Sequence, residues 1–209
     1  MLTDYVLGGL AVWFAVKLAR QSRWRINDPV FLWAASFASL ALASFSGGAY
    51  HGLTQHLGPI WLATTWKVTL YSIGIVSLFL FAAATIAAFE GPLRKALLVA
   101  GFLKFVVYVI WIANHDDFVY AILDYAPAML YVLVLQALAW RRREESGHWI
   151  VAGVLVSFAG AAVQQSGFTL HRHFNHNDLY HVIQMAGVYL LYRGGSLLKD
   201  RAASNSVDR

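Results

Sequence analysis

The chain has 209 residues, of which 59% are hydrophobic and 13% are charged, and it contains no cysteine. A soluble domain needs more polar surface than this, so the composition favours a membrane protein, and the lack of cysteine excludes disulfides and thiolate metal ligands. The formal net charge is +5. The basic residues lie beside apolar segments, which is typical of anchoring at a membrane and not of nucleic-acid binding.

Seven apolar segments are long enough to cross about 30 Å of hydrocarbon, which takes roughly 20 helical residues. We predict them at residues 4–20, 29–52, 60–89, 95–114, 117–140, 148–170 and 178–197. They predict an all-α integral membrane protein, a seven-transmembrane-helix bundle that forms a single domain over residues 1–201. A short disordered tail should follow at 202–209.

The placement of lysine and arginine orients this bundle, because cytoplasmic loops carry the excess of both residues. One side holds Lys17, Arg20, Arg23, Arg25, Arg94, Lys95, Arg141, Arg142, Arg143, Arg193, Lys199, Arg201 and Arg209. The opposite loops hold only Arg172. We therefore predict an outer amino terminus and a cytoplasmic carboxyl terminus. The compact loops favour a bacterial inner membrane.

The histidines gather on the predicted outer side. They are His51, His56, His115, His171, His173, His176 and His181, and only His148 falls on the cytoplasmic side. This distribution favours an ion or proton-handling site; the alternative is that polar outer loops place some histidines at the lipid head groups. His51 and His181 lie within helix ends, where an imidazole is costly to bury unless it is paired or bound to a metal.

Other polar residues lie inside the apolar segments. Lys67 and Asp124 have similar predicted depths, so we expect an ion pair between the third and fifth helices. Lys104 should snorkel or face an internal cavity. In the sixth helix, the small residues Gly153 and Gly160 should let a neighbouring helix approach closely.

The seventh segment has a polar start. Asn177 and Asp178 are candidates to cap its helix, and Asp178 is alternatively a carboxylate that orients a ligand histidine. We expect glutamines of the sixth and seventh helices, Gln164, Gln165 and Gln184, to line the same polar pocket or to bond between helices.

With these residues the chain resembles the superfamily of transmembrane hydrolases that includes the alkaline ceramidases and the adiponectin/progestin receptors. That family has a serine and a histidine near the end of the second helix, an aspartate early in the third, and two histidines four residues apart in the seventh. His51 and His181 stand at two of these positions. Ser46 and His176 are each one residue out of register, an offset that a bulge at a helix end can absorb, and Trp66-Lys67 occupies the place of the acid.

The resemblance implies a zinc-dependent hydrolase that acts on a lipid amide or ester at the extracytoplasmic face. His51, His176 and His181 would hold the zinc ion and leave a fourth position for water, whose pKa the metal lowers to about 7. Asp178 would act as the base and Ser46 as a contact to the oxyanion, while a lipid-like substrate enters from the outer leaflet.

The alternative is a non-enzymatic receptor, carrier or metal-binding membrane protein on the same scaffold. A pocket near His51 and His181 that opens to lipid would favour the hydrolase. A polar path that continues past Lys104 to the cytoplasm would favour a transporter.

Overall fold

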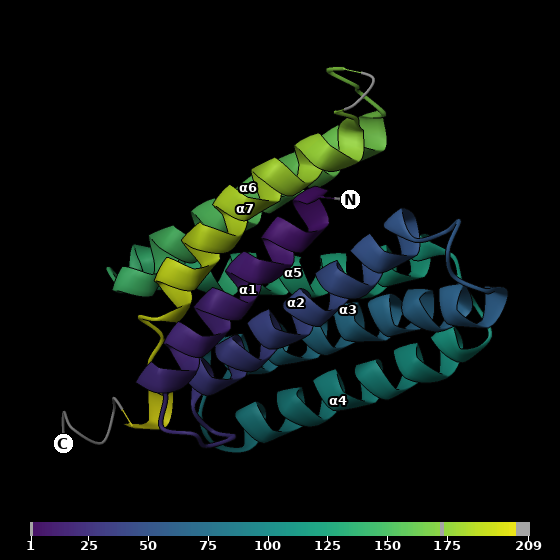
Figure 1. The fold of residues 1–209 in the computed structure, drawn as a ribbon. Helices are drawn as coiled ribbons and strands as arrows, with labels where there is room; N and C mark the ends of the chain where they lie inside the picture. The colour runs from purple at the N-terminus through teal and green to yellow at the C-terminus, as the bar shows by residue number, and fades with distance from the viewer. Residues whose placement is uncertain (1, 172–173, 204–209) are drawn as a thin grey trace.

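The computed structural model describes residues 2–171 and 174–203, and it is shown in Figure 1. Its long helices are α1 (Leu2–Gln21), α2 (Pro29–Gly52), α3 (Pro59–Ala88), α4 (Gly91–Ala113), α5 (Phe118–Arg141), α6 (Glu145–Ser166) and α7 (His176–Gly195). A further helical turn follows at 201–203, and no β-strand forms within the described residues. Each predicted apolar segment therefore forms a helix. Residues 204–209 lie outside the described part, so the disordered tail stays a prediction.

Local sequence signals explain where the helices begin and end. Asp28 precedes α2, and its carboxylate accepts a hydrogen bond from the Val30 backbone N–H at 2.9 Å. Asp117 caps α5 in the same way, through Val119. Gly167 closes α6 in the left-handed conformation, with φ of 67°, which glycine adopts without steric cost.

Six helices form a closed ring in the order α1, α2, α3, α5, α6, α7, while α4 lies outside the ring against α3 (Figure 1). Helices α1 and α7 run parallel, because Thr3 contacts Asp178 at one end and Gln21 bonds to Ser196 at the other. We call the end of the bundle at which α1, α3, α5 and α7 begin the histidine end. The end at which these four helices finish is the basic end.

The half of the ring toward the basic end is filled by a continuous apolar core. Trp33, Ile86, Val154 and Leu191 are all buried in this cluster. The Trp33 indole N–H donates to the Leu191 carbonyl at 2.9 Å and ties α2 to α7. A solid core of this kind closes the interior of the ring toward the basic end.

Helices α6 and α7 pack closely through glycine, as the sequence predicts. A Cβ atom at Gly153 would lie 2.9 Å from the backbone nitrogen of Leu191. One at Gly160 would lie 3.3 Å from side-chain atoms of Tyr180 and Ile183. Small residues therefore set the distance between these two helices.

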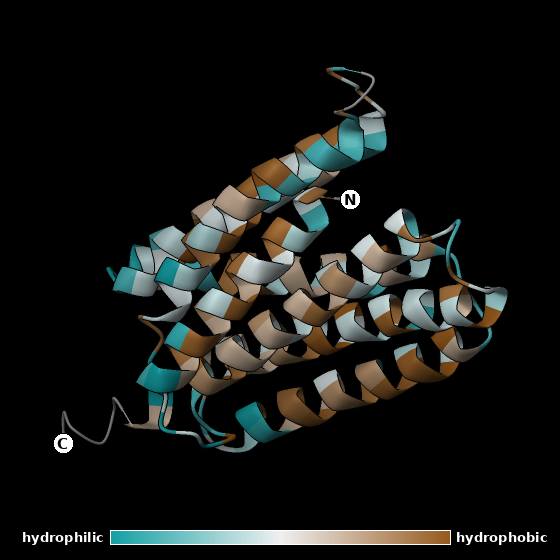
Figure 2. Cartoon of the chain, in the orientation of Figure 1, coloured by the Kyte–Doolittle hydropathy of each residue, from teal (hydrophilic) through white to brown (hydrophobic). Residues whose placement is uncertain are grey.

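Helices α1 to α6 are long and apolar enough to cross a membrane, judged by length and composition. Figure 2 shows the apolar character of α3 and α4 along most of their length. The outer face of α4 exposes Phe102, Leu103, Val107 and Ile110, which suits contact with lipid. These features indicate a multi-pass integral membrane protein. Helix α7 is not among these six candidate spans, and its first three turns carry most of its polar residues.

Candidate functional site

A cavity of about 740 Å³ lies inside the ring at the histidine end. All six ring helices contribute to its wall, whereas α4 does not. Polar side chains of α7 such as Asn177, His181 and Gln184 line one side of the ring, and apolar side chains such as Ile73 of α3 and Ile122 of α5 line the other. The volume falls within the range of about 300–1,000 Å³ that is typical of small-molecule sites. The cavity therefore combines a polar wall with an apolar one.

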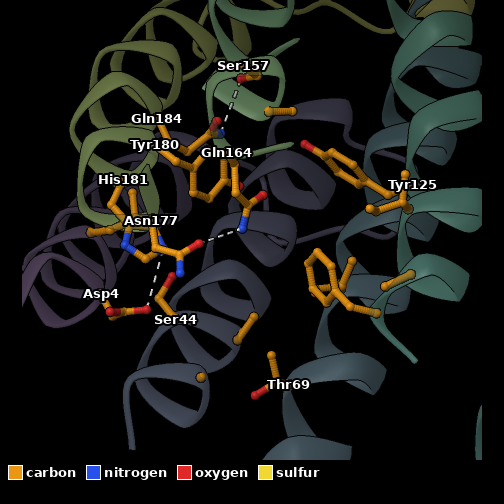
Figure 3. Close-up of a pocket in the computed structure, with 18 of the residues that line it drawn as sticks. Asp4, Ser44, Thr69, Tyr125, Ser157, Gln164, Asn177, Tyr180, His181 and Gln184 are labelled. Atoms are coloured by element: carbon orange, nitrogen blue, oxygen red, sulfur yellow. Dashed lines mark hydrogen bonds and ion pairs between the residues drawn. The ribbon is translucent and has the colours of Figure 1, made fainter. Parts of the chain in front are cut away.

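A hydrogen-bonded cluster joins the starts of α1 and α7 at the polar wall. The Thr3 hydroxyl donates to Asp178 Oδ1 at 2.8 Å and lies 3.1 Å from His181 Nδ1. The other ring nitrogen of His181, Nε2, lies 3.5 Å from Asp4 Oδ1, and Figure 3 shows Asp4 and His181 facing each other at the cavity. Because both nitrogens have a side-chain partner, the orientation of the imidazole is fixed.

Amide and hydroxyl groups continue this polar wall toward the middle of the bundle (Figure 3). Gln164 donates to Asn177 Oδ1 at 3.2 Å, and Gln184 donates to the Ser157 hydroxyl at 3.2 Å. Both bonds join α6 to α7. The predicted polar pocket of glutamines is therefore confirmed for Gln164, Gln165 and Gln184, which all line the cavity.

The cap of α7 differs from the prediction in one residue. Asn175 is the N-cap, and its side chain accepts the backbone N–H groups of Asn177 and Asp178. Asp178 completes a capping box by accepting the Asn175 backbone N–H at 3.2 Å. Asp178 thus has the predicted capping role, whereas Asn177 turns its side chain to the cavity.

The residues predicted for a catalytic zinc site are only partly brought together. His51, Asp178 and His181 line one cavity, and His51 lies within electrostatic range of His181. Ser46 and His176 are not among the lining residues. The Ser46 hydroxyl donates to the Leu42 carbonyl at 2.6 Å and accepts from Thr69 at 3.0 Å.

Helical geometry explains why these two residues are absent from the cavity. Residues five apart on an α-helix point about 140° apart, whereas residues four apart point about 40° apart. Helices α2 and α7 are continuous here, so no bulge corrects the one-residue offset. The lining positions four residues before His51 and His181 are instead Gly47 and Asn177.

Of the residues predicted for the zinc site, His51, Asp178 and His181 line the cavity. Within the described residues, no three or more histidine, aspartate or glutamate side chains are placed to hold a metal ion. His51 lies at an exposed helix end, and both nitrogens of His181 are engaged. The side chains as arranged do not fit a three-histidine zinc site, so zinc stays a prediction. Arg172 and His173 lie outside the described residues.

The predicted ion pair between Lys67 and Asp124 is wrong. Asp124 pairs with Lys104 of α4 at 2.6 Å, and Lys67 pairs with Asp116 at 2.7 Å. Lys67 also donates to the carbonyl groups at the end of α4. Similar depth suggested the pairing, but the direction in which each side chain leaves its helix decides it.

Sequence reasoning missed Thr3 and Asp4. Asp4 is buried, with 5% of its surface exposed, although it lies in the first turn of an apolar helix. An ionisable side chain within a membrane segment is a candidate for function, and this one lies on the predicted side of the histidines. An acidic residue inside an apolar helix, on the same side as the histidines, could therefore have been identified as a site candidate from the sequence.

Comparison with known proteins identifies the family of this chain. The search of curated proteins and the search of solved structures each found no match. A family model matches residues 1–200. The chain therefore belongs to the family described as "Family of unknown function (DUF6962)".

Proposed function

We propose that this protein is a seven-helix membrane protein that binds an amphiphilic, lipid-like molecule in the cavity at the histidine end. The observation that carries the proposal is the cavity itself, which has one polar and one apolar wall. The apolar wall would hold a hydrocarbon chain by removing it from contact with water. The Asp4, Asp178 and His181 cluster, together with the amides of Gln164 and Asn177, would hold a polar group within the ligand, such as an amide or ester linkage.

The proposed topology places the histidine end outside and the basic end in the cytoplasm, in a bacterial inner membrane. Arginines at the basic end, such as Arg20, Arg94 and Arg141, support this orientation. Helix α7 would be the seventh span. It is 20 residues long and parallel to α1, and its polar side chains form hydrogen bonds with α1 and α6.

The shape of the cavity favours binding over conduction. Its deepest lining residues, such as Gln184 and Val76, lie near the middle of their helices. The apolar core around Trp33 and Leu191 lies between this point and the basic end. Lys104 is bonded to Ser77 and Asp124 and is not a lining residue. A polar path past Lys104, which would favour a transporter, finds no support in this arrangement.

Hydrolysis of a lipid amide or ester is the second candidate. Its support is the position of His181, the imidazole that Thr3 and Asp4 hold at the cavity wall. The resemblance to the ceramidase superfamily belongs to this candidate, and so does zinc.

One experiment tests both candidates. Purified protein in detergent would be titrated with tritiated N-hexadecanoylethanolamine, a neutral single-chain amide, and the same samples would be examined for released hexadecanoic acid. Ala161→Trp should fill the cavity and weaken binding at least tenfold. Ala100→Trp, on the exposed face of α4, should leave binding unchanged.

The outcomes separate the candidates. Equal binding by both variants, or none by the wild type, would contradict the proposed cavity. Binding with release of hexadecanoic acid, lost in His181→Ala, would identify a hydrolase. In that case, zinc analysis of the wild type against His51→Ala would decide whether a metal takes part.

A further inference from the structure

A second hollow of about 550 Å³ lies beside the cavity at the histidine end. Its wall includes Tyr50 at the end of α2, Trp66 of α3 and Phe118 at the start of α5. Trp66 and Phe118 also line the main cavity. The two spaces therefore share these two rings in their linings, and the hollow lies directly beside the main cavity.

Three aromatic rings from three helices line the hollow. The centroid of Trp66 lies 4.7 Å from that of Tyr50 and 6.0 Å from that of Phe118. The indole N–H of Trp66 donates to the Asp116 carbonyl at 2.7 Å, which fixes the orientation of the ring. The three rings together form one aromatic surface at the hollow.

Two carboxylates stand beside the rings. Asp116 and Asp117 both line the hollow. Lys67 pairs with Asp116 at 2.7 Å, and it is held toward the end of α4 by backbone carbonyls. Asp117 accepts one backbone N–H, that of Val119. Lys67 and Asp116 balance each other, so Asp117 leaves the lining with a net negative charge.

We propose that this hollow is the head-group subsite for an amphiphile whose chain occupies the main cavity, and that the head group is a quaternary or other alkylated ammonium cation. Aromatic faces attract such cations through the ring quadrupole, and a carboxylate adds long-range attraction. This inference rests on the proposed function and names its ligand class. Aromatic residues also gather at membrane interfaces as anchors, but these three line a hollow beside carboxylates.

The test compares ligands with one chain length and different heads. Hexadecyltrimethylammonium and hexadecanol would each displace tritiated N-hexadecanoylethanolamine from the wild type, from Trp66→Leu and from Asp117→Asn. Asparagine is also a good N-cap, so the second variant removes the charge and keeps the start of α5. Trp61→Leu is the matched control, because Trp61 is an exposed tryptophan at the same end of α3 that lines neither space.

We expect Trp66→Leu and Asp117→Asn each to weaken binding of the ammonium probe by about 3- to 30-fold relative to binding of hexadecanol. This is the range expected for one cation–aromatic or charge contact. Trp61→Leu should leave this ratio unchanged. For each probe, the affinity of the variant is divided by that of the wild type, so the partition of the probe into detergent micelles cancels.

Four results would overturn the assignment. Equal losses for both probes in Trp66→Leu would make the ring a wall and not a cation site. Choline that binds as tightly as the alkylated probe would assign the hollow to a soluble cation. If the wild type binds hexadecanol and the ammonium probe with equal affinity, the head-group assignment fails and the proposed cavity stands; if it binds neither, both fail.

Discussion

Replacing Lys104 with methionine should strongly destabilise the protein, because it leaves a buried carboxylate without its cation. Asp124 is 7% exposed, and its Oδ1 lies 2.6 Å from Lys104 Nζ. Its other oxygen has no hydrogen-bond partner among the described residues. Removing one member of a buried pair costs about 3–5 kcal/mol. For a chain of this size, that loss corresponds to a fall of about 6–20 °C in Tm.

Thermal unfolding in detergent would measure this effect against two other variants. Asp116→Asn breaks a pair of similar length, but the Asp116 side chain is 69% exposed and Lys67 keeps its backbone partners, so the loss should be at most about 1 kcal/mol. The double variant Lys104→Met/Asp124→Leu should regain most of the stability, since it removes both charges. The reasoning is refuted if Lys104→Met and Asp116→Asn lower Tm equally, or if the double variant is no more stable than Lys104→Met.

Three further substitutions test the packing and capping. Gly153→Ala should lower the free energy of unfolding by about 1–3 kcal/mol, because its Cβ would lie 2.9 Å from the Leu191 backbone nitrogen. The control Gly9→Ala, whose Cβ would have nothing within 4 Å, should not destabilise the protein. Equal Tm values for the two variants would contradict this reasoning. Asn175→Ala should cost about 1 kcal/mol through the lost α7 cap, measured by the same unfolding, and an unchanged Tm would argue against the cap. Trp33→Phe should cost about 1–3 kcal/mol by leaving the Leu191 carbonyl without its indole donor, and a loss below about 0.5 kcal/mol would show that the bond contributes little.

The helices could be predicted from sequence because their signals are local. Long apolar segments define each helix, and Asp28, Asp117 and Gly167 mark ends within a few residues of the predicted ones. The gathering of His51 and His181 could also be predicted, since depth along a helix follows from residue number.

Contacts between helices could not be predicted in the same way. Thr3 and Asp178 are 175 residues apart in the chain, and only the closing of the ring brings them together. The exchange of partners by Lys67 and Asp124 has a related cause. The partner of each residue depends on the direction in which its side chain leaves the helix. In a helix that is apolar on all sides, the sequence gives little indication of which face turns inward.

The residues of α2 and α7 that line the cavity bear on what the protein binds. Where the ceramidase-like pattern has a serine and a histidine, the lining positions hold Gly47 and Asn177. A glycine offers no ligand atom, and an amide is a poor ligand for zinc beside imidazole, but both suit a binding pocket. Asn177 receives a hydrogen bond from Gln164 at 3.2 Å, so its side chain contributes to a network of neutral polar groups. A wall of this chemistry suits the polar groups of an amphiphile better than it suits a metal ion, which favours the binding proposal over the zinc hydrolase.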